Sequence, residues 1–209
     1  MPRLFILSPA NCSGIRAKMV LRAEASFPLA VTLRGGDGAP LGDVMAFMSG
    51  LYFRGKQAYA RAFARPPEGE AGAFVITPNR GLWPLEETIT ARELCDFARG
   101  DIDAANPRYR RPLVADVRRL AATDAEIVLL GSIATAKYVD VLTEVLGERL
   151  LFPTDFVGRG DVSRGGLMLR CVDDKRELDY EPVVGAVRHG ERPAKLQRRP
   201  GLGKRLAGG

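Results

Sequence analysis

The stretch LFILSPANCSGIR (residues 4–16) decides the fold. Its four apolar residues are followed at once by Ser8-Pro9, a pattern typical of a short buried strand that ends abruptly. Ser13 and Gly14 then precede a helical pattern, and Ser13 is a suitable N-cap. The stretch therefore predicts a buried strand that leads through a small polar loop into a helix.

The same unit recurs along the chain. Residues 126–130 (EIVLL) form the clearest strand, and they precede a helix over residues 132–146 that ends at Gly147. Because strands and helices alternate, we expect a single α/β domain with a mostly parallel central sheet flanked by helices. The other expected elements are strands over 29–33, 74–77 and 150–152, a strand or helical turn over 167–172, and helices over 41–64 (interrupted at 49–50), 90–98 (with a capping box) and 112–122.

Ligands of such sheets bind beyond the carboxyl ends of the strands. Three loops occupy that position in the expected order of elements. They are residues 8–14, 77–82 and 131–135.

The positive charge of the chain is concentrated at its C-terminal end. The sequence has 31 Lys and Arg against 25 Asp and Glu, and seven of those bases but only one acid follow Val187. The 24 bases and 24 acids before that point balance. We therefore expect an α/β domain over residues 1–187 and a basic, disordered tail over residues 188–209.

Composition argues against several classes of protein. The three cysteines form no CxxC pair and there is a single histidine, so a structural zinc site is not expected. Free thiols suit a reducing compartment, and no secretory signal or apolar run long enough to span a membrane is present. We expect a cytoplasmic protein with no membrane partner, and nothing in the sequence implies a cofactor.

Two strand-to-helix loops are candidate anion sites. Ser8, Asn11 and Ser13 follow the first strand, where hydroxyl groups and free backbone N–H groups can bind a phosphate. The alternative is a strand-to-helix turn with a serine cap, since the loop lacks a GxGxxG or P-loop pattern. The stretch GSIATAKY (residues 131–138) offers three further candidates, with N-capping by the serine and a solvated lysine as the alternative: Ser132, Thr135 and Lys137.

A third candidate is GRGDVSRGG at residues 158–166. Its glycines allow successive N–H groups to turn toward one anion, and arginine adds a bidentate fork that suits phosphate. We expect Arg159, Ser163 and Arg164 to bind phosphate there. The alternative is a flexible surface loop.

A fourth candidate is GLYFRGK at residues 50–56. Aromatic residues interleaved with bases can stack nucleobases and contact phosphates, which makes Tyr52 and Lys56 candidate binding residues. Such spacing also describes one apolar helix face beside a solvated one, and this interpretation is favoured for Phe53 and Phe63.

Other catalytic arrangements have less support. No Ser-His-Asp triad is expected, because His189 is alone at the start of the tail. Cys12 is near the start of a helix, which lowers the pKa of a thiol, but a buried inert thiol is an equal alternative.

Five islands of sequence, in order, resemble the YaaA peroxide-stress family. They are ILSPA at residues 6–10, GLY with Gly55 at 50–55, GLWPL at 81–85, GSIATAKY at 131–138 and RGDVSR at 159–164. The resemblance implies a fold similar to that of uracil-DNA glycosylases. It also implies association with DNA and protection from oxidative damage as part of a stress response.

Two functions follow as hypotheses. The first is a nucleic-acid-associated protein similar to the YaaA family, possessing a basic tail that binds phosphates. The second is an enzyme that acts on a nucleoside, nucleotide or modified base, for example an N-glycosidase, in which Ser8, Asn11, Ser132 and Arg164 share one pocket. The expected partner is thus a nucleic acid or a nucleotide-like small molecule. A domain that only binds a protein partner is the third alternative.

Overall fold

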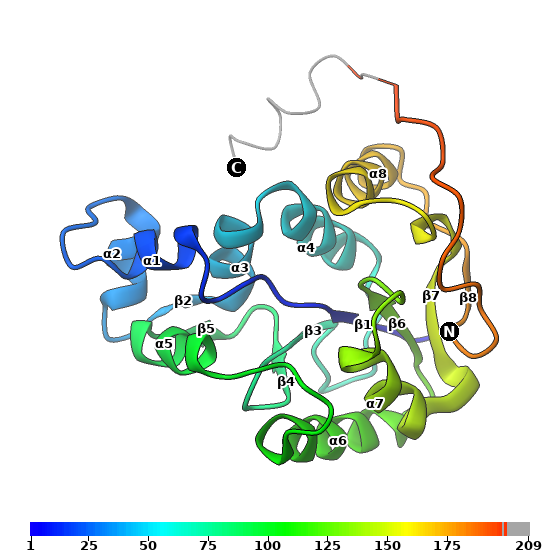
Figure 1. Cartoon of the computed structure of the whole chain (residues 1–209), viewed down its shortest axis with the longest axis horizontal. Coiled ribbons are helices and arrows are strands. Elements are labelled where there is room, and N and C mark those ends of the chain that lie inside the picture. The colour runs from blue at the N-terminus through cyan, green and yellow to red at the C-terminus, as the bar shows by residue number, and fades with distance from the viewer. Residues whose placement is uncertain (198, 200–209) are drawn as a thin grey trace.

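The computed structural model describes residues 1–197 and residue 199. It has a six-stranded sheet in the order β4-β3-β1-β6-β7-β8 (Figure 1). The four inner strands are parallel, and one antiparallel strand lies at each edge, so the expected α/β domain with a mostly parallel sheet is confirmed. The strands are β1 (Arg3–Leu7), β3 (Ala73–Ile76), β4 (Leu82–Pro84), β6 (Glu126–Leu130), β7 (Leu150–Pro153) and β8 (Tyr180–Pro182).

The two central strands, β1 and β6, fix the geometry of the site. They are apolar runs buried on both faces, as is usual for parallel strands covered by helices. They pair in register with Leu7 opposite Leu130, and the Ser8 N–H donates to Leu130 O at 3.3 Å. Consequently Ser8 and Gly131 leave the sheet side by side.

Helices cover both faces of the sheet. Helices α3, α4 and α8 lie on one side in Figure 1, and α6 and α7 lie on the other. Side chains of β1 alternate between the two cores: Phe5 and Leu7 join one, and Leu4 and Ile6 join the other. The helices are α1 (Ile15–Leu21), α2 (Pro28–Arg34), α3 (Leu41–Ser49), α4 (Leu51–Phe63), α5 (Ala91–Arg99), α6 (Pro107–Ala121), α7 (Ala136–Leu146) and α8 (Asp161–Asp173), with 3-10 turns at Gly147–Arg149 and Thr154–Phe156 and a two-stranded ribbon of β2 (Ala39–Pro40) and β5 (Thr88–Ile89).

Several expected elements are confirmed. The interruption of the 41–64 helix lies at Gly50, whose φ of 64° is favourable only for glycine. At the start of α5, Thr90 and Glu93 form the predicted capping box. Strand β6 has the predicted bounds.

The expectation of a strand over residues 29–33 is wrong. Those residues belong to α2, in which Pro28 occupies the first turn, a position that proline favours. Ala30 and Leu33, three residues apart, are buried, whereas Val31 is 53% exposed. The burial pattern in the structure has the period of a helix. The apolar run itself is too short for that period to be recognised in the sequence.

Helix boundaries also differ from the prediction. The helix expected from 112 begins at Pro107, with Asn106 as N-cap, and it continues through Pro112. The helix expected from Ser132 begins at Ala136, so Ser132 is not its N-cap. The two antiparallel edge strands and the β2–β5 ribbon have only two or three residues each, too few to show periodicity.

The glycine-rich stretch 158–166 is not an extended loop. From Asp161 it is the first turns of α8, and residues 167–172 continue that helix. Gly165 lies against Gly55 of α4, because a Cβ on Gly55 would be 2.6 Å from Gly165 O. The glycine at 165 therefore permits close helix packing instead of backbone bending toward a ligand.

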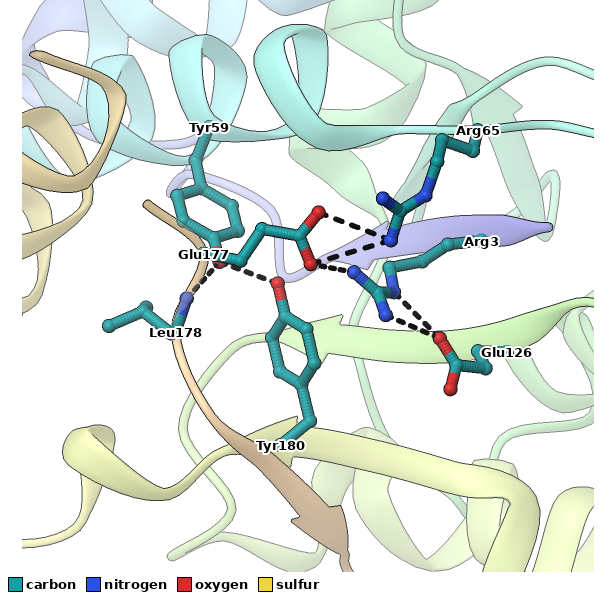
Figure 2. A network of polar contacts seen from close by, with 7 residues as sticks. All are labelled: Arg3, Tyr59, Arg65, Glu126, Glu177, Leu178 and Tyr180. Carbon is teal, nitrogen blue, oxygen red and sulfur yellow. Dashed lines mark hydrogen bonds and ion pairs between the residues drawn. The ribbon is translucent and has the colours of Figure 1, made fainter. Parts of the chain in front are cut away.

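A polar network ties the start of β1 to the segment before β8 (Figure 2). The Arg3 guanidinium donates to Glu126 at 2.6 Å and pairs with Glu177, which Arg65 also contacts at 3.2 Å. Nearby, the hydroxyls of Tyr59 and Tyr180 lie 2.5 Å apart, and Leu178 N–H donates to Tyr59. The network is satisfied internally, and we assign it a structural role.

The predicted tail is described only in part. Residues 188–197 have no helix or strand, and Arg188 pairs with Asp140 at 3.4 Å. Arg199 pairs with Asp174 at 2.7 Å. Residue 198 and residues 200–209, with three of the seven tail bases, lie outside the described part. No helix in the described part is long and apolar enough to cross a membrane.

Candidate functional site

A pocket of about 650 Å³ opens at the carboxyl edge of the sheet. The loops after β1, β3 and β6 all contribute to it, as the order of elements predicts. The connections after β1 and β6 leave toward opposite halves of the sheet, so the crevice between these strands is a topological switch point, where α/β proteins bind ligands. Its lining includes Ser8–Ser13, Pro78, Ser132, Lys137 and Tyr138, with Tyr52, Phe97, Asp101 and Asp161 from elsewhere.

Ser8 and Lys56 form a hydrogen-bonded pair at the floor of this pocket. Lys56 Nζ lies 2.6 Å from Ser8 Oγ and 2.8 Å from Ser8 O. Ser8 lines the pocket and Lys56 lies behind it, with only 1% of its surface exposed. Gly131 permits this packing, because a Cβ there would lie 3.1 Å from Ser8 Cβ and 3.2 Å from Ser8 Oγ.

Lys56 is held in an apolar surrounding. Its Nζ lies 3.9 Å from the centre of the Tyr52 ring and 5.3 Å from that of Phe53. No carboxylate in the described part of the chain reaches it within ion-pair distance. Burial lowers the pKa of Lys56 to about 7, with the Asp161 charge opposing and the Arg164 charge adding to the shift. Near neutral pH this lysine is therefore divided between its charged and neutral forms.

Two phenols belong to the same site. Tyr52 is 8% exposed and lines the pocket; its hydroxyl makes no hydrogen bond of good geometry in the described residues, and the Arg164 guanidinium is its charged neighbour. Tyr138 Oη donates to Ser132 O at 3.0 Å. Burial raises the pKa of both phenols, so both remain protonated donors at neutral pH.

The first loop places Asn11 and Ser13 in the pocket. Both are exposed, and Asn11 Oδ1 accepts from Ser13 N and Ser13 Oγ at 3.0 and 2.8 Å. Burial raises the pKa of the Cys12 thiol to about 12, which supports the inert thiol over an activated one.

Two of the three candidates in the second loop line the pocket, and the third does not. Ser132 and Lys137 line the pocket, with Lys137 exposed near its mouth. Thr135 is the N-cap of α7 without a side-chain cap bond, is exposed, and is absent from the lining.

The third stretch faces a neighbouring cavity of about 440 Å³. Arg159 and Arg164 line it, and Arg159 donates to Ser163 Oγ at 3.3 Å. Arg164 is 8% exposed; its Nε donates to Phe156 O at 3.1 Å and its Nη1 to Asp161 at 3.4 Å. Ser8, Asn11 and Ser132 thus share one pocket. Arg164 does not line that pocket, but it pairs with Asp161, which does. Around the cavity's remaining wall are Ala134, Gly158, Gly160, Arg188, His189, Gly190 and Arg192.

The sequence interpretation missed residues that the fold adds to the site. Tyr138 ends the candidate stretch 131–138 without being named as a binding residue, and its position in the first turn of α7, beside the strand end, is the signal for it. Asp161 is not among the candidates in residues 158–166, but it pairs with Arg164 and lines the pocket. Phe97 and Asp101 come from the end of α5 and the loop after it, which no local pattern connects with the strand ends.

Among the described residues, no group of three or more His, Cys, Asp and Glu side chains is placed to hold a metal ion. Comparisons with protein-family models, curated proteins and solved structures gave no match.

Proposed function

We propose that this chain is an enzyme that acts on a nucleoside, a nucleotide or a modified base in the pocket between β1 and β6. One observation carries the proposal: a fully buried lysine contacts a serine at the floor of a pocket built from three strand ends. Perturbed titratable groups in such a pocket are typical of catalytic sites.

The lining suits a ligand with an aromatic and an anionic part. Tyr52, Phe97 and Tyr138 offer apolar ring surface, and Asn11 offers an amide for a base edge. Lys137, in the first turn of α7, is placed for a phosphate, which helix N-termini also favour. The volume of about 650 Å³ lies in the usual range for small-molecule sites.

The resemblance to the YaaA family supports this proposal. A parallel sheet with its site at the carboxyl ends of the central strands is compatible with a fold similar to that of uracil-DNA glycosylases. The proposal therefore includes a fold similar to that of uracil-DNA glycosylases, N-glycosidase-like chemistry and a cytoplasmic location. Fold analogy alone is a weak guide to activity, so the pocket residues carry the argument.

The direct test is a thermal-shift screen of the full chain against bases, nucleosides and nucleotides. A ligand that binds only the folded protein must raise its melting temperature. We expect at least one compound to do so, and Lys137→Ala to lose about tenfold in affinity for the phosphorylated form, roughly 1.4 kcal/mol. Lys18→Ala, which removes an exposed lysine outside the pocket, serves as the control. A silent screen would refute the proposal.

A second candidate, association with nucleic acid, has an observation of its own. Four arginines and His189 line the 440 Å³ cavity next to the pocket: Arg159, Arg164, Arg188 and Arg192. Such a basic surface can hold a phosphate backbone while one nucleotide enters the pocket. Protection of DNA under oxidative stress would be a function of this surface.

Its test is DNA binding across a salt series. Replacing Arg188 and Arg192 by alanine should weaken binding and flatten the salt dependence by about two units of slope. Replacing Arg92 and Arg118, exposed arginines away from the cavity, should have a smaller effect. If the full chain does not bind DNA at low salt, this candidate fails.

A further inference from the structure

The arrangement of Ser8 and Lys56 has the geometry of a nucleophile and its base. Ser8 faces the pocket, and the amine lies directly behind it. The main-chain carbonyl of Ser8 can only accept, so one N–H of Lys56 donates to it at 2.8 Å. The hydroxyl can donate as well as accept. A neutral Lys56 is thus positioned to accept the Ser8 Oγ proton at 2.6 Å.

We propose that Ser8 is a catalytic nucleophile, that Lys56 is its general base, and that the pair cleaves a carboxylic ester or amide carried by the ligand. The inference rests on the proposed function for the location of the substrate, and it places the reaction at an acyl group of the ligand instead of at an N-glycosidic bond. It assigns the chain to serine–lysine acyl transfer.

The step can be written with every atom in place. Lys56 Nζ takes the Ser8 Oγ proton as Oγ bonds to the carbonyl carbon, and the carbonyl oxygen becomes an oxyanion. The oxyanion collapses, the bond from carbon to the leaving group breaks, and Lys56 returns the proton to that group. Water then attacks the carbonyl carbon of the acyl-serine as Lys56 takes a proton from it. The bond between that carbon and Ser8 Oγ breaks, Lys56 returns the proton to Oγ, and the carboxylic acid leaves.

The unpartnered hydroxyl of Tyr52 has a role in this scheme. It is a buried, protonated phenol that lines the same pocket; the neighbouring Arg164 guanidinium can only donate to its oxygen, so the phenol proton remains available to a ligand. A free donor in a water-poor site stabilises a developing oxyanion more strongly than it binds a neutral carbonyl. We assign Tyr52 to that position.

The charged surroundings of Lys56 suit a base near neutral pH. The groups around it are Ser8, the rings of Tyr52 and Phe53, and the charges of Asp161 and Arg164. Asp161 and Arg164 pair with each other at 3.4 Å, so their effects on the amine largely offset. Burial remains the main influence and holds the pKa of Lys56 at about 7.

Other nucleophiles in the pocket lack this support. The Cys12 thiol has a raised pKa, and its Sγ donates to Ala10 O at 3.6 Å, which is no base. Ser13 donates to an amide oxygen of Asn11, which is no base. Ser132 Oγ accepts from Ala134 N. In the part of the chain that the structure describes, Ser8 alone among the pocket's serines has an amine within hydrogen-bond distance.

The test uses the full chain and an ethoxy alkylfluorophosphonate, which forms an Oγ–P bond with an activated serine and releases fluoride. We expect one adduct by intact mass, mapped to Ser8, with a labelling rate that rises with pH through about 7. Ser8→Ala should remove the adduct. Lys56→Met should slow labelling at least about 100-fold, the lower range of general-base effects. Ser26→Ala, an exposed serine outside the pocket, is the control and should label like wild type.

Three results would overturn the inference: no adduct on Ser8 of the folded wild type, equal rates in wild type and folded Lys56→Met, or a wild-type rate that does not change between pH 6 and about 8. If Lys56→Met does not fold, the wild-type pH profile decides. The outcome is separable from that of the proposed function. Labelling at Ser8 with a silent nucleotide screen refutes only the nucleotide ligand, and nucleotide binding without labelling refutes only the nucleophile.

Discussion

Gly55 of α4 and Gly165 of α8 approach so closely that neither has room for a side chain. A Cβ on Gly55 would lie 2.6 Å from Gly165 O, and a Cβ on Gly165 would lie 2.5 Å from Leu51 O. This contact holds α8 against α4. Since α4 carries Tyr52 and Lys56, and α8 carries Asp161 and Arg164, it also sets the spacing of the site.

Gly165→Ala should therefore destabilise the protein by about 1–3 kcal/mol through overpacking. Its neighbour on the same helix, Gly166, provides a matched control, because a Cβ there would meet only Leu196 Cδ1 at 3.6 Å. Gly166→Ala should be neutral or stabilising by up to about 1 kcal/mol, since alanine favours helix. Urea denaturation of both variants measures the difference, and equal effects would contradict the close packing.

This glycine pair shows where local pattern stops being informative. Residues 158–166 have the composition of a loop, and only the contact with α4 explains why residue 165 is a glycine within a helix. The strands over 4–7 and 126–130 were predictable, because four or more consecutive apolar residues bounded by a turn leave few alternatives. Their parallel pairing then placed three loops in one pocket, as expected. By contrast, that Lys56 is buried behind Ser8 depends on how α4 crosses β1, and no spacing within residues 50–56 encodes that.

Arg3→Met should cost about 2–4 kcal/mol of unfolding free energy. The change leaves the carboxylates of Glu126 and Glu177, each half-buried, without their shared cation. Arg61→Met is the control, because Arg61 and Glu86 form a similar pair with side chains that are 48% and 60% exposed. Its cost should stay below about 1 kcal/mol. Comparable losses in the two variants, measured by urea denaturation, would remove the structural role assigned to the network in Figure 2.

The buried lysine predicts a pH-dependent stability. Between the folded pKa of about 7 and the ordinary lysine pKa of 10.5, the unfolded state retains a proton that the folded state has lost. Stability therefore rises with pH in this window. Below the window both states are protonated, so the destabilisation caused by the buried charge is at its largest and no longer changes with pH. We expect the stability of wild type relative to Lys56→Met to increase by up to about 1.4 kcal/mol per pH unit from pH 7 to 10.

Lys18→Met provides the control for that titration. It replaces an exposed lysine, and its stability relative to wild type should stay constant over the same range. Chemical denaturation at each pH gives the comparison. A Lys56→Met difference that is flat or falls as the pH rises would show that Lys56 keeps its charge in the folded protein.

The hydroxyl of Tyr52 should affect stability and ligand binding in opposite directions. Burying a hydroxyl without a partner costs free energy, so Tyr52→Phe should stabilise the unliganded protein by about 1 kcal/mol. The same change removes a donor from the pocket, and it should weaken binding of the most effective ligand of the thermal-shift screen by up to about tenfold. Tyr109→Phe is a matched control, because that hydroxyl is also buried without a partner in the described residues, but it belongs to the core on the other face of the sheet. Both variants should melt higher than wild type, and only Tyr52→Phe should lose affinity. If Tyr52→Phe destabilises the free protein, its hydroxyl already has a partner in the fold and is not held free for a ligand.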